Sequence, residues 1–244
     1  MAQLAVPAGN RSVSMGHVHL LVHDVDAQRQ FWVAFGGVAK VGAEVRIEFP
    51  GVFVMLRQGE PTGGTIGSVV NHIGFNVKSV AESVAKWKAA GLKPEPGARP
   101  TQVWFTTADG VRIEILEDDT ITVPLKFQHV HYNVPAGAEP QVEAWYAKMF
   151  GAVPAMRGRF KGADIAGANL TFQEAEGKAV PTKGRAIDHV GFQVLNLDSF
   201  IQKLHEQGVE MEGPVRTAPN GITKVAFLTD PWGTSLELTE GLGK

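Results

Sequence analysis

Apolar and polar residues alternate in four stretches of the chain that share one pattern. Each stretch has a histidine as its second residue, followed by alternating apolar positions, which is typical of a strand with one buried face. The four stretches cover residues 16–20, 71–75, 128–132 and 188–192. The first and third contain His-Val-His, whereas the second and fourth share His-x-Gly-Phe-x-Val. This self-similarity predicts a half made of two modules that has been duplicated.

A helix and three further strands are predicted after each of these starts. Apolar residues at helical spacing occupy residues 27–36, 80–91, 139–151 and 197–208, and each stretch ends in glycine, a residue common at helix C-termini. Strand-like stretches separated by proline and glycine follow. The predicted fold class is α+β, with four βαβββ modules in two cup-shaped domains of paired modules. Weak periodicity at residues 118–124 divides the chain into domains 1–120 and 121–244.

Strand alternation places the histidines on the polar face of each first strand. In the first module His17 and His19 point away from Val18 and Leu20, and the other three starts repeat this arrangement. Because the apolar face must be covered by the helices, the histidines lie on the opposite face. We expect them to face a cavity if the sheets curl.

The last strands of the second and fourth modules each supply an acid to this polar face. Glu114 and Glu237 both lie four residues after a glycine and alternate with apolar neighbours. The equivalent positions in the first and third modules are Met55 and Thr171. Each half of the chain therefore has two histidines, one glutamate and one position that is not a strong ligand.

Two neutral imidazoles and one carboxylate form a ligand set that suits Fe, Mn, Zn, Ni or Co as a divalent ion. Three protein ligands leave coordination positions for water and substrate, as in catalytic sites. The candidate metal ligands are His17, His72, Glu114, His129, His189 and Glu237. The alternative is that each histidine only forms hydrogen bonds to neighbouring backbone.

Two further histidines lie on the same face as the candidate ligands. His19 and His131 each follow a candidate ligand by two residues. They are candidate catalytic residues that could transfer protons or form hydrogen bonds to a substrate. The alternative is that they are polar lining residues without a catalytic role.

Composition excludes several other kinds of chemistry and partner. The 244 residues include no cysteine, which excludes disulfides, thiolate metal sites and cysteine nucleophiles. A net charge of −2 gives no attraction to nucleic acid or acidic membranes, and no apolar run reaches transmembrane length. The first four residues lack the features of a signal peptide. We expect a soluble monomer or homodimer that binds a small-molecule substrate, and is cytoplasmic or exported with its signal removed.

The chain resembles the vicinal oxygen chelate superfamily, which includes glyoxalase I, extradiol dioxygenases and bleomycin-binding proteins. The resemblance extends from about residue 16 to residue 242, and its strongest features are the His-Val/Ile-x-Φ-x-Val starts and the segment 230–233, Asp-Pro-Trp-Gly, before Glu237. It implies that paired modules form a cup with metal ligands on their first and last strands. The implied groups are His17, His72 and Glu114 in one site and His129, His189 and Glu237 in the other. Pairing of the first module with the fourth, and the second with the third, would regroup the same residues.

The resemblance implies a metal-dependent enzyme whose small substrate chelates the metal through adjacent oxygens. Its chemistry would be enolate stabilisation or O₂ activation, in a lyase, isomerase or dioxygenase. The alternative is a non-catalytic small-molecule binding or resistance protein of the same fold. Met55 and Thr171 stand where glyoxalase I has a fourth ligand, and Phe227 stands where extradiol dioxygenases have a tyrosine. We find no basic cluster in the sequence of the kind that binds phosphonate in fosfomycin-resistance proteins.

Overall fold

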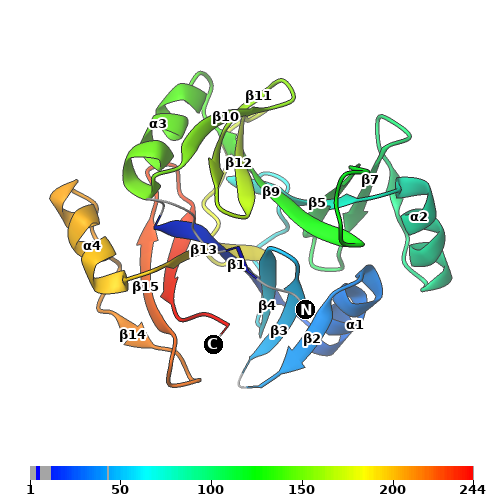
Figure 1. Ribbon diagram of the computed structural model, residues 1–244, viewed down its shortest axis with the longest axis horizontal. Helices are drawn as coiled ribbons and strands as arrows, with labels where there is room; N and C mark the ends of the chain where they lie inside the picture. The colour runs from blue at the N-terminus through cyan, green and yellow to red at the C-terminus, as the bar shows by residue number, and fades with distance from the viewer. Residues whose placement is uncertain (1–3, 6–11, 43, 244) are drawn as a thin grey trace.

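Four βαβββ modules follow one another along the chain (Figure 1), in a computed structural model that describes residues 4–5, 12–42 and 44–243. Residues 1–3, on which the expectation about a signal peptide partly rests, lie outside this range. Module 1 comprises β1 (Val13–Val22), α1 (Val25–Phe35), β2 (Val38–Val41), β3 (Val45–Phe49) and β4 (Val52–Gln58). Module 2 comprises β5 (Val70–Val77), α2 (Val80–Ala89), β6 (Glu95–Pro96), β7 (Gln102–Thr106) and β8 (Arg112–Glu117).

The second half of the chain repeats this order of elements. Module 3 comprises β9 (Leu125–Val134), α3 (Glu139–Phe150), β10 (Val153–Arg157), β11 (Phe160–Ile165) and β12 (Ala168–Glu174). Module 4 comprises β13 (Ile187–Val194), α4 (Leu197–Glu206), β14 (Arg216–Thr217), β15 (Lys224–Thr229) and β16 (Ser235–Glu240). The predicted α+β fold of four such modules is confirmed. Among the described residues, no helix has the length and hydropathy needed to cross a membrane.

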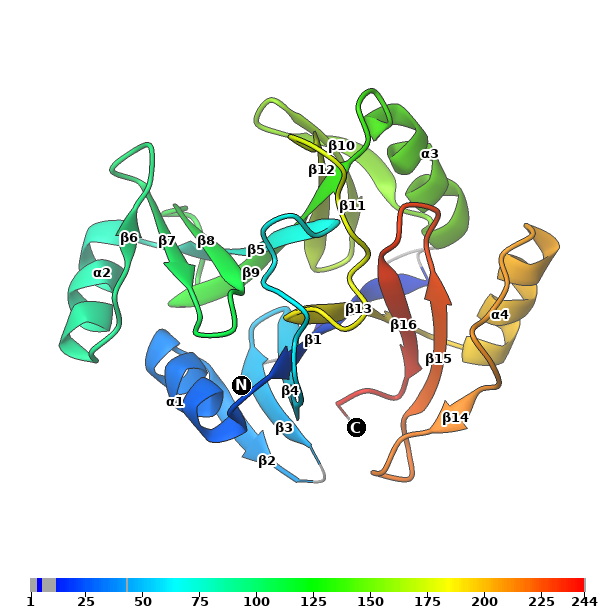
Figure 2. The same cartoon turned by 180° about the vertical axis from the view of Figure 1, so that it is seen from behind.

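The strands form two eight-stranded sheets, and each sheet combines two modules (Figures 1 and 2). The first has the order β14-β15-β16-β13-β1-β4-β3-β2, and the second has the order β10-β11-β12-β9-β5-β8-β7-β6. At their centres β1 pairs antiparallel with β13, and β5 pairs antiparallel with β9. The sheets therefore join module 1 to module 4 and module 2 to module 3. The expectation that module 1 pairs with module 2, and module 3 with module 4, is wrong, and the regrouped alternative is correct.

Aromatic contacts between helices and strands link modules that do not share a sheet. Phe35 of α1 stacks on Trp87 of α2 at a centroid distance of 5.2 Å, and its carbonyl accepts a hydrogen bond of 2.8 Å from the Trp87 indole. In the other half, the ring centroids of Phe150 of α3 and Phe192 of β13 are 5.3 Å apart. These contacts join module 1 to module 2 and module 3 to module 4, within one buried apolar cluster that includes residues of all four modules. The division into residues 1–120 and 121–244 stays a prediction, and the sheets cross it.

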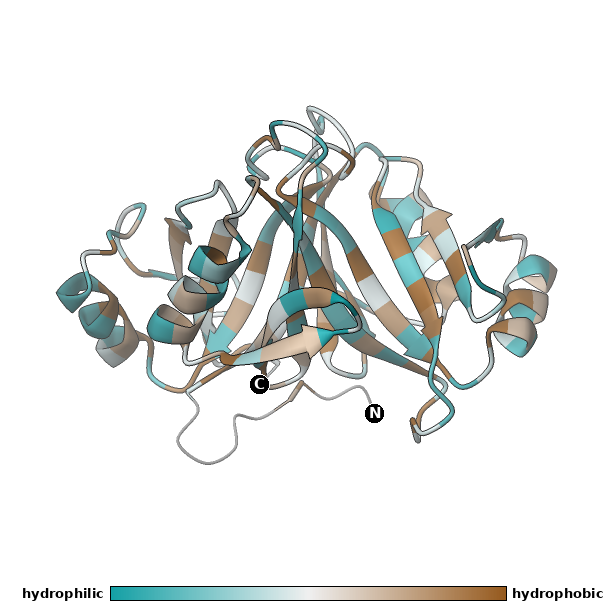
Figure 3. Ribbon diagram, turned by 90° about the horizontal axis from the view of Figure 1, so that it is seen from above, coloured by the Kyte–Doolittle hydropathy of each residue, from teal (hydrophilic) through white to brown (hydrophobic). Residues whose placement is uncertain are grey.

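The predicted alternation along the first strands is confirmed. Val18, Leu20 and Val22 are completely buried in the core. Figure 3 shows polar and apolar residues alternating along the strands, with the helices at the outer flanks of the molecule. Because the helices cover the apolar face, the histidines of β1 and the other first strands lie on the opposite face.

Candidate metal centres

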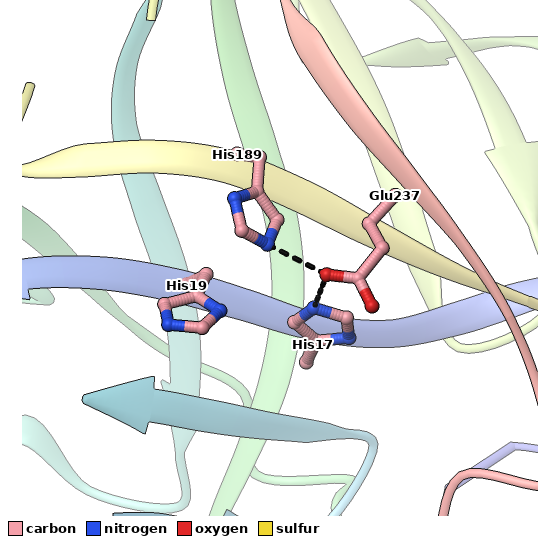
Figure 4. Close-up of side chains that lie close together, drawn as sticks. All are labelled: His17, His19, His189 and Glu237. Carbon is pink, nitrogen blue, oxygen red and sulfur yellow. Dashed lines mark hydrogen bonds and ion pairs between the residues drawn. The ribbon is translucent and has the colours of Figure 1, made fainter. Parts of the chain in front are cut away.

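The sheet of modules 1 and 4 brings together His17, His19, His189 and Glu237, which we call site 1 (Figure 4). Two of the histidines come from β1, one from β13, and the glutamate from β16. One ligand atom from each residue lies within 4.8 Å of the others, and all four residues are buried. His17 Nε2 is 3.2 Å and His189 Nε2 is 2.8 Å from Glu237 Oε2. These residues come from opposite ends of the chain and meet because β1 pairs with β13.

The geometry of site 1 fits a metal ion. Ligands bound at about 2.1 Å in tetrahedral or octahedral geometry lie roughly 3.0–3.4 Å from one another, close to the observed separations. His19 Nε2 is buried and has no hydrogen-bond partner among the described residues. An unpaired imidazole nitrogen beside a carboxylate costs free energy unless a proton or a cation is shared between them. The donor set of imidazoles and one carboxylate suits a divalent transition metal.

A glycine makes room for the His17 ring in site 1. Gly191 of β13 is the register partner of His17 on β1. A Cβ atom at Gly191 would lie 2.0 Å from the His17 ring. Gly74 has the same relation to His129 in the other sheet, where a Cβ atom would lie 1.9 Å from the ring. The glycine of the repeated His-x-Gly motif therefore allows a histidine from the paired module to lie across it.

Neighbouring charges and hydrogen bonds in site 1 favour the protonated form of His189 and the ionised form of Glu237. Although burial opposes its charged form, hydrogen bonds with Asp188 and Glu237 raise the pKa of His189. Burial likewise opposes the charged form of Glu237, but the neighbouring His17 and His189 hold the pKa of that carboxyl well below its usual range. Burial and the nearby histidine charges lower the pKa of His19 well below its ordinary value. Asp188 Oδ1 lies 2.7 Å from His189 Nδ1 and so orients the ring with Nε2 toward Glu237.

Site 1 opens onto a cavity of about 540 Å³. All four site residues line it, and Met55 and Phe227 add apolar surface. Basic side chains outnumber acidic ones along its wall; they are Lys40, Arg46, Arg57 and Arg216. These basic residues are scattered along the sequence, so that only the folded chain gathers them. The sequence shows no basic cluster, but the folded chain brings these four basic residues to the wall of one cavity.

The sheet of modules 2 and 3 brings together His72, His129, His131 and Glu114, which we call site 2. The three histidines offer ligand atoms within 4.8 Å of one another. Glu114 Oε2 lies 3.5 Å from His72 Nε2 and 3.3 Å from His129 Nε2. Burial is the main reason that the pKa of His129 falls to about 3 and that of His131 to about 2.

Site 2 contains an arginine that has no counterpart among the site 1 contacts. Arg157 Nη1 lies 3.4 Å from Glu114 Oε2, and Arg157 Nη2 lies 3.2 Å from His131 Nδ1. The cavity beside this site has a volume of about 700 Å³. His72 and His131 line it, but His129 and Glu114 are not among its described lining residues. The two triads are nevertheless buried to a similar degree, since Glu114 is 6% exposed and Glu237 is 8% exposed.

All eight candidate residues lie at one of the two sites, but the two expected groups are wrong. His17 and His189 lie with Glu237, whereas His72 and His129 lie with Glu114. The physical reason is the pairing of module 1 with module 4 and module 2 with module 3. Whether these residues bind metal, and whether His19 and His131 act in catalysis, stays a prediction.

Sequence reasoning missed the residues that distinguish the two sites. Asp188 directly precedes His189, as Asn71 precedes His72, so an oriented acceptor next to each histidine could have been recognised from the sequence. Arg157 gave no such signal, since it ends an edge strand, β10, and lies 43 residues from Glu114 along the chain. The His-x-Gly motif was a usable signal for module pairing, because its glycine predicts a bulky partner on the neighbouring strand.

Known proteins support the class that this fold and these sites define. Residues 128–238 match the family model of the Glyoxalase/Bleomycin resistance protein/Dioxygenase superfamily, which confirms the resemblance seen in the sequence. The match covers most of modules 3 and 4, and similarity to this superfamily is shown for that segment. "Uncharacterized protein YwkD" of Bacillus subtilis (strain 168) is 34% identical over 71 residues, which are 29% of this chain and 55% of that protein. The match thus spans about half the length of this relative.

Solved structures extend the similarity of fold to nearly the whole chain. A "putative dioxygenase" from Bacillus subtilis subsp. subtilis str. 168 has a TM-score of 0.72 and 14% identity, and the alignment covers 95% of this chain and 86% of that one. Glyoxalase I from Zea mays has a TM-score of 0.71 and 17% identity, with 94% of this chain and 92% of that one covered. At these identities the similarity is one of fold.

Proposed function

We propose that the chain is a metal-dependent enzyme of the vicinal oxygen chelate type whose active centre is site 1. The convergence of three imidazoles and one carboxylate at the base of an open cavity carries this proposal. His17, His189 and Glu237 would hold a divalent ion of Fe, Mn, Zn, Ni or Co. Such an ion would act as a Lewis acid toward two adjacent oxygens of a small substrate. The reaction class is a lyase, an isomerase or a dioxygenase.

The residues around the triad have separate roles in this proposal. Asp188 fixes the orientation of the His189 ring, so that its Nε2 faces the ion. His19 presents an unpaired Nε2 at the same cavity and is proposed to move a proton to or from the substrate. Met55 and Phe227 form apolar walls that exclude water from the reacting atoms.

The basic wall of the cavity favours a substrate that carries negative charge. Arg46 is already paired with Glu48 at 2.6 Å. The Arg57 side chain is half exposed and lies 3.7 Å from Asp188, a distance that leaves the guanidinium free to contact a ligand. A small carboxylate with an adjacent hydroxyl or carbonyl oxygen has both features, because it can chelate an ion and neutralise these cations. This chemistry matches the oxygen-chelating substrate that the superfamily resemblance implies.

Elemental analysis of protein purified without chelator tests the metal centre. The wild-type chain is expected to contain a divalent metal, and His189→Ala is expected to lose it. His205→Ala is the matched control, because His205 is a half-exposed histidine on α4 away from both sites. Equal metal content in wild type and His189→Ala would overturn the proposal. That result would support the alternative of a non-catalytic small-molecule binding protein of the same fold.

Cobalt-substituted protein tests the substrate class. Oxalate is a dianion with adjacent oxygens, and it should change the visible spectrum of the Co(II) protein if two coordination positions are open to it. Arg57→Met should weaken this oxalate binding by about 5- to 10-fold through the loss of one cation. A Co(II) spectrum that does not respond to oxalate would contradict chelation through adjacent oxygens at this site.

A further inference from the structure

The side chain of Arg157 is held in site 2 by contacts along its whole guanidinium. Arg157 Nε donates to Thr171 Oγ1 at 2.8 Å, while its two terminal nitrogens contact Glu114 and His131. The Thr171 hydroxyl in turn donates to Asn169 Oδ1 at 2.6 Å. The arginine side chain is only 15% exposed. Such a chain of contacts leaves the guanidinium one position, beside the carboxylate of the triad.

The corresponding place in site 1 has no side chain. Met55 and Thr171 hold the same register position in the two sheets, opposite the second histidine of each site. Counted along the strand register outward from these two residues, Gly42 holds the position in the first sheet that Arg157 holds in the second. One residue difference at the end of an edge hairpin therefore places a guanidinium beside the triad of site 2, whereas the equivalent position in site 1 is a glycine.

Both carboxylate oxygens of Glu114 accept hydrogen bonds from groups other than the histidines, although His72 Nε2 and His129 Nε2 have no hydrogen-bond partner among the described residues. Gln102 Nε2 donates to Glu114 Oε1, and Arg157 Nη1 donates to Glu114 Oε2. In site 1, by contrast, the side-chain hydrogen bonds of Glu237 among the described residues are with His17 and His189 alone. A divalent ion at site 2 would lie close to a fixed positive charge in a buried environment, where repulsion is poorly screened.

We infer that the guanidinium of Arg157 takes the place of a metal ion in site 2, so that the chain binds one divalent ion rather than two. Site 2 is then an internal ion-pair centre that joins modules 2 and 3, and its cavity binds no ligand through a metal. The count of one ion rests on the proposed function of site 1. The exclusion of metal from site 2 depends only on Arg157.

Titration of the full-length, metal-free protein with Co(II) tests this inference. Visible absorption and elemental analysis after gel filtration count the ions bound per chain. Wild type is expected to bind one ion, which His189→Ala removes and His72→Ala leaves in place. Arg157→Met keeps the length of the side chain and removes its charge, and it is expected to bind two ions. Adding His72→Ala to this variant should return the count to one.

Two further variants keep the test decisive. Arg159→Met is the matched control, since Arg159 is exposed in the adjoining turn and its guanidinium lies 5.0 Å from the Phe160 ring. Arg157→Gln retains a donor for Thr171 and serves if Arg157→Met does not fold. A wild-type count of two that falls to one in His72→Ala would overturn the inference, as would a count unchanged in both Arg157 variants. A wild-type count of zero that rises to one in them would uphold it while refuting the proposed function of site 1.

Discussion

Sites 1 and 2 have the same ligand types on equivalent strands, yet they differ in the charged and polar groups that surround the ligands. All four residues of site 1 line its cavity, and the Nδ1 atom of His189 contacts the carboxylate of Asp188. In site 2, His72 and His131 line the cavity, His72 contacts the amide of Asn71, and the guanidinium of Arg157 lies beside Glu114. The comparison teaches that a ligand triad alone does not define a metal centre. The charge and access supplied by neighbouring strands decide what the triad can bind.

The largest difference is expected when the carboxylate of each site is neutralised. Glu114→Gln leaves Arg157 buried without its counter-charge and should lower the unfolding free energy of the metal-free protein by about 3 kcal/mol. Glu237→Gln should cost about 1 kcal/mol, because His189 keeps the carboxylate of Asp188 as a partner. Chemical denaturation measures both values.

A double variant identifies the cause of that loss. Glu114→Gln combined with Arg157→Met should be less destabilised than the sum of the two single changes, because no unpaired charge remains. Equal losses for Glu114→Gln and Glu237→Gln, together with additivity in the double variant, would show that the two carboxylates have equivalent surroundings.

Substitutions of the two glycines that make room for histidines should distinguish an effect on stability from an effect on metal binding. Gly191→Ala displaces the His17 ring, and Gly74→Ala displaces the His129 ring. Each change should cost about 1–3 kcal/mol through overpacking. We expect Gly191→Ala alone to lose bound metal, which elemental analysis would detect.

Gly177→Ala is the control for these variants, since no described heavy atom lies within 4 Å of a Cβ there. Full metal content in a folded Gly191→Ala variant would contradict the assignment of His17 as a ligand.

Exchanging the acceptors behind the histidines should have a smaller effect. Asp188→Asn gives site 1 the amide that site 2 has naturally, and it should weaken metal affinity by about 10- to 100-fold. The reciprocal change, Asn71→Asp, should leave metal affinity unchanged. Competition with a chelator of known affinity measures both, and a loss in Asn71→Asp equal to that in Asp188→Asn would oppose the distinction between the sites.

The smallest effect is expected in the pH dependence of stability of the metal-free protein. Burial lowers the pKa of His131 to about 2, so below its ordinary value the unfolded chain takes up a proton that the folded chain does not. The contribution of His131 to the unfolding free energy is complete above about pH 6.5 and falls by about 1.4 kcal/mol per pH unit as the pH decreases. His131→Gln should reduce this slope.

His189 should act in the opposite direction. Its pKa is raised by Asp188 and Glu237 despite burial, so its stabilising contribution is present below about pH 6.5 and is lost as the pH rises through its folded pKa. Denaturant titrations of His189→Gln and His131→Gln at about pH 5.5 and pH 7.5 should therefore change the slope with opposite signs. The exposed His205 provides the control, and slopes that change in the same direction would contradict the difference between the sites.

The sequence was sufficient to predict the strand and the face on which each candidate ligand lies. Alternation along each first strand put His17 and His19 opposite Val18 and Leu20, and this pattern depends only on the two-residue period of a strand. The same period put Glu237 on the polar face of the last strand. Helix ends were predictable within a few residues, because glycine and proline act through local backbone geometry.

The tertiary structure alone decided which residues share a site. All four modules have similar edges and faces, so local pattern cannot distinguish pairing of modules 1 and 2 from pairing of modules 1 and 4. The choice depends on contacts between distant residues, such as the His17 ring lying across Gly191. The contact of Arg157 could not be predicted for the same reason. Its side chain reaches the site only because a hairpin of module 3 lies beside Glu114 of module 2. Sequence period determines the face of a residue, whereas the packing of whole modules determines its neighbours.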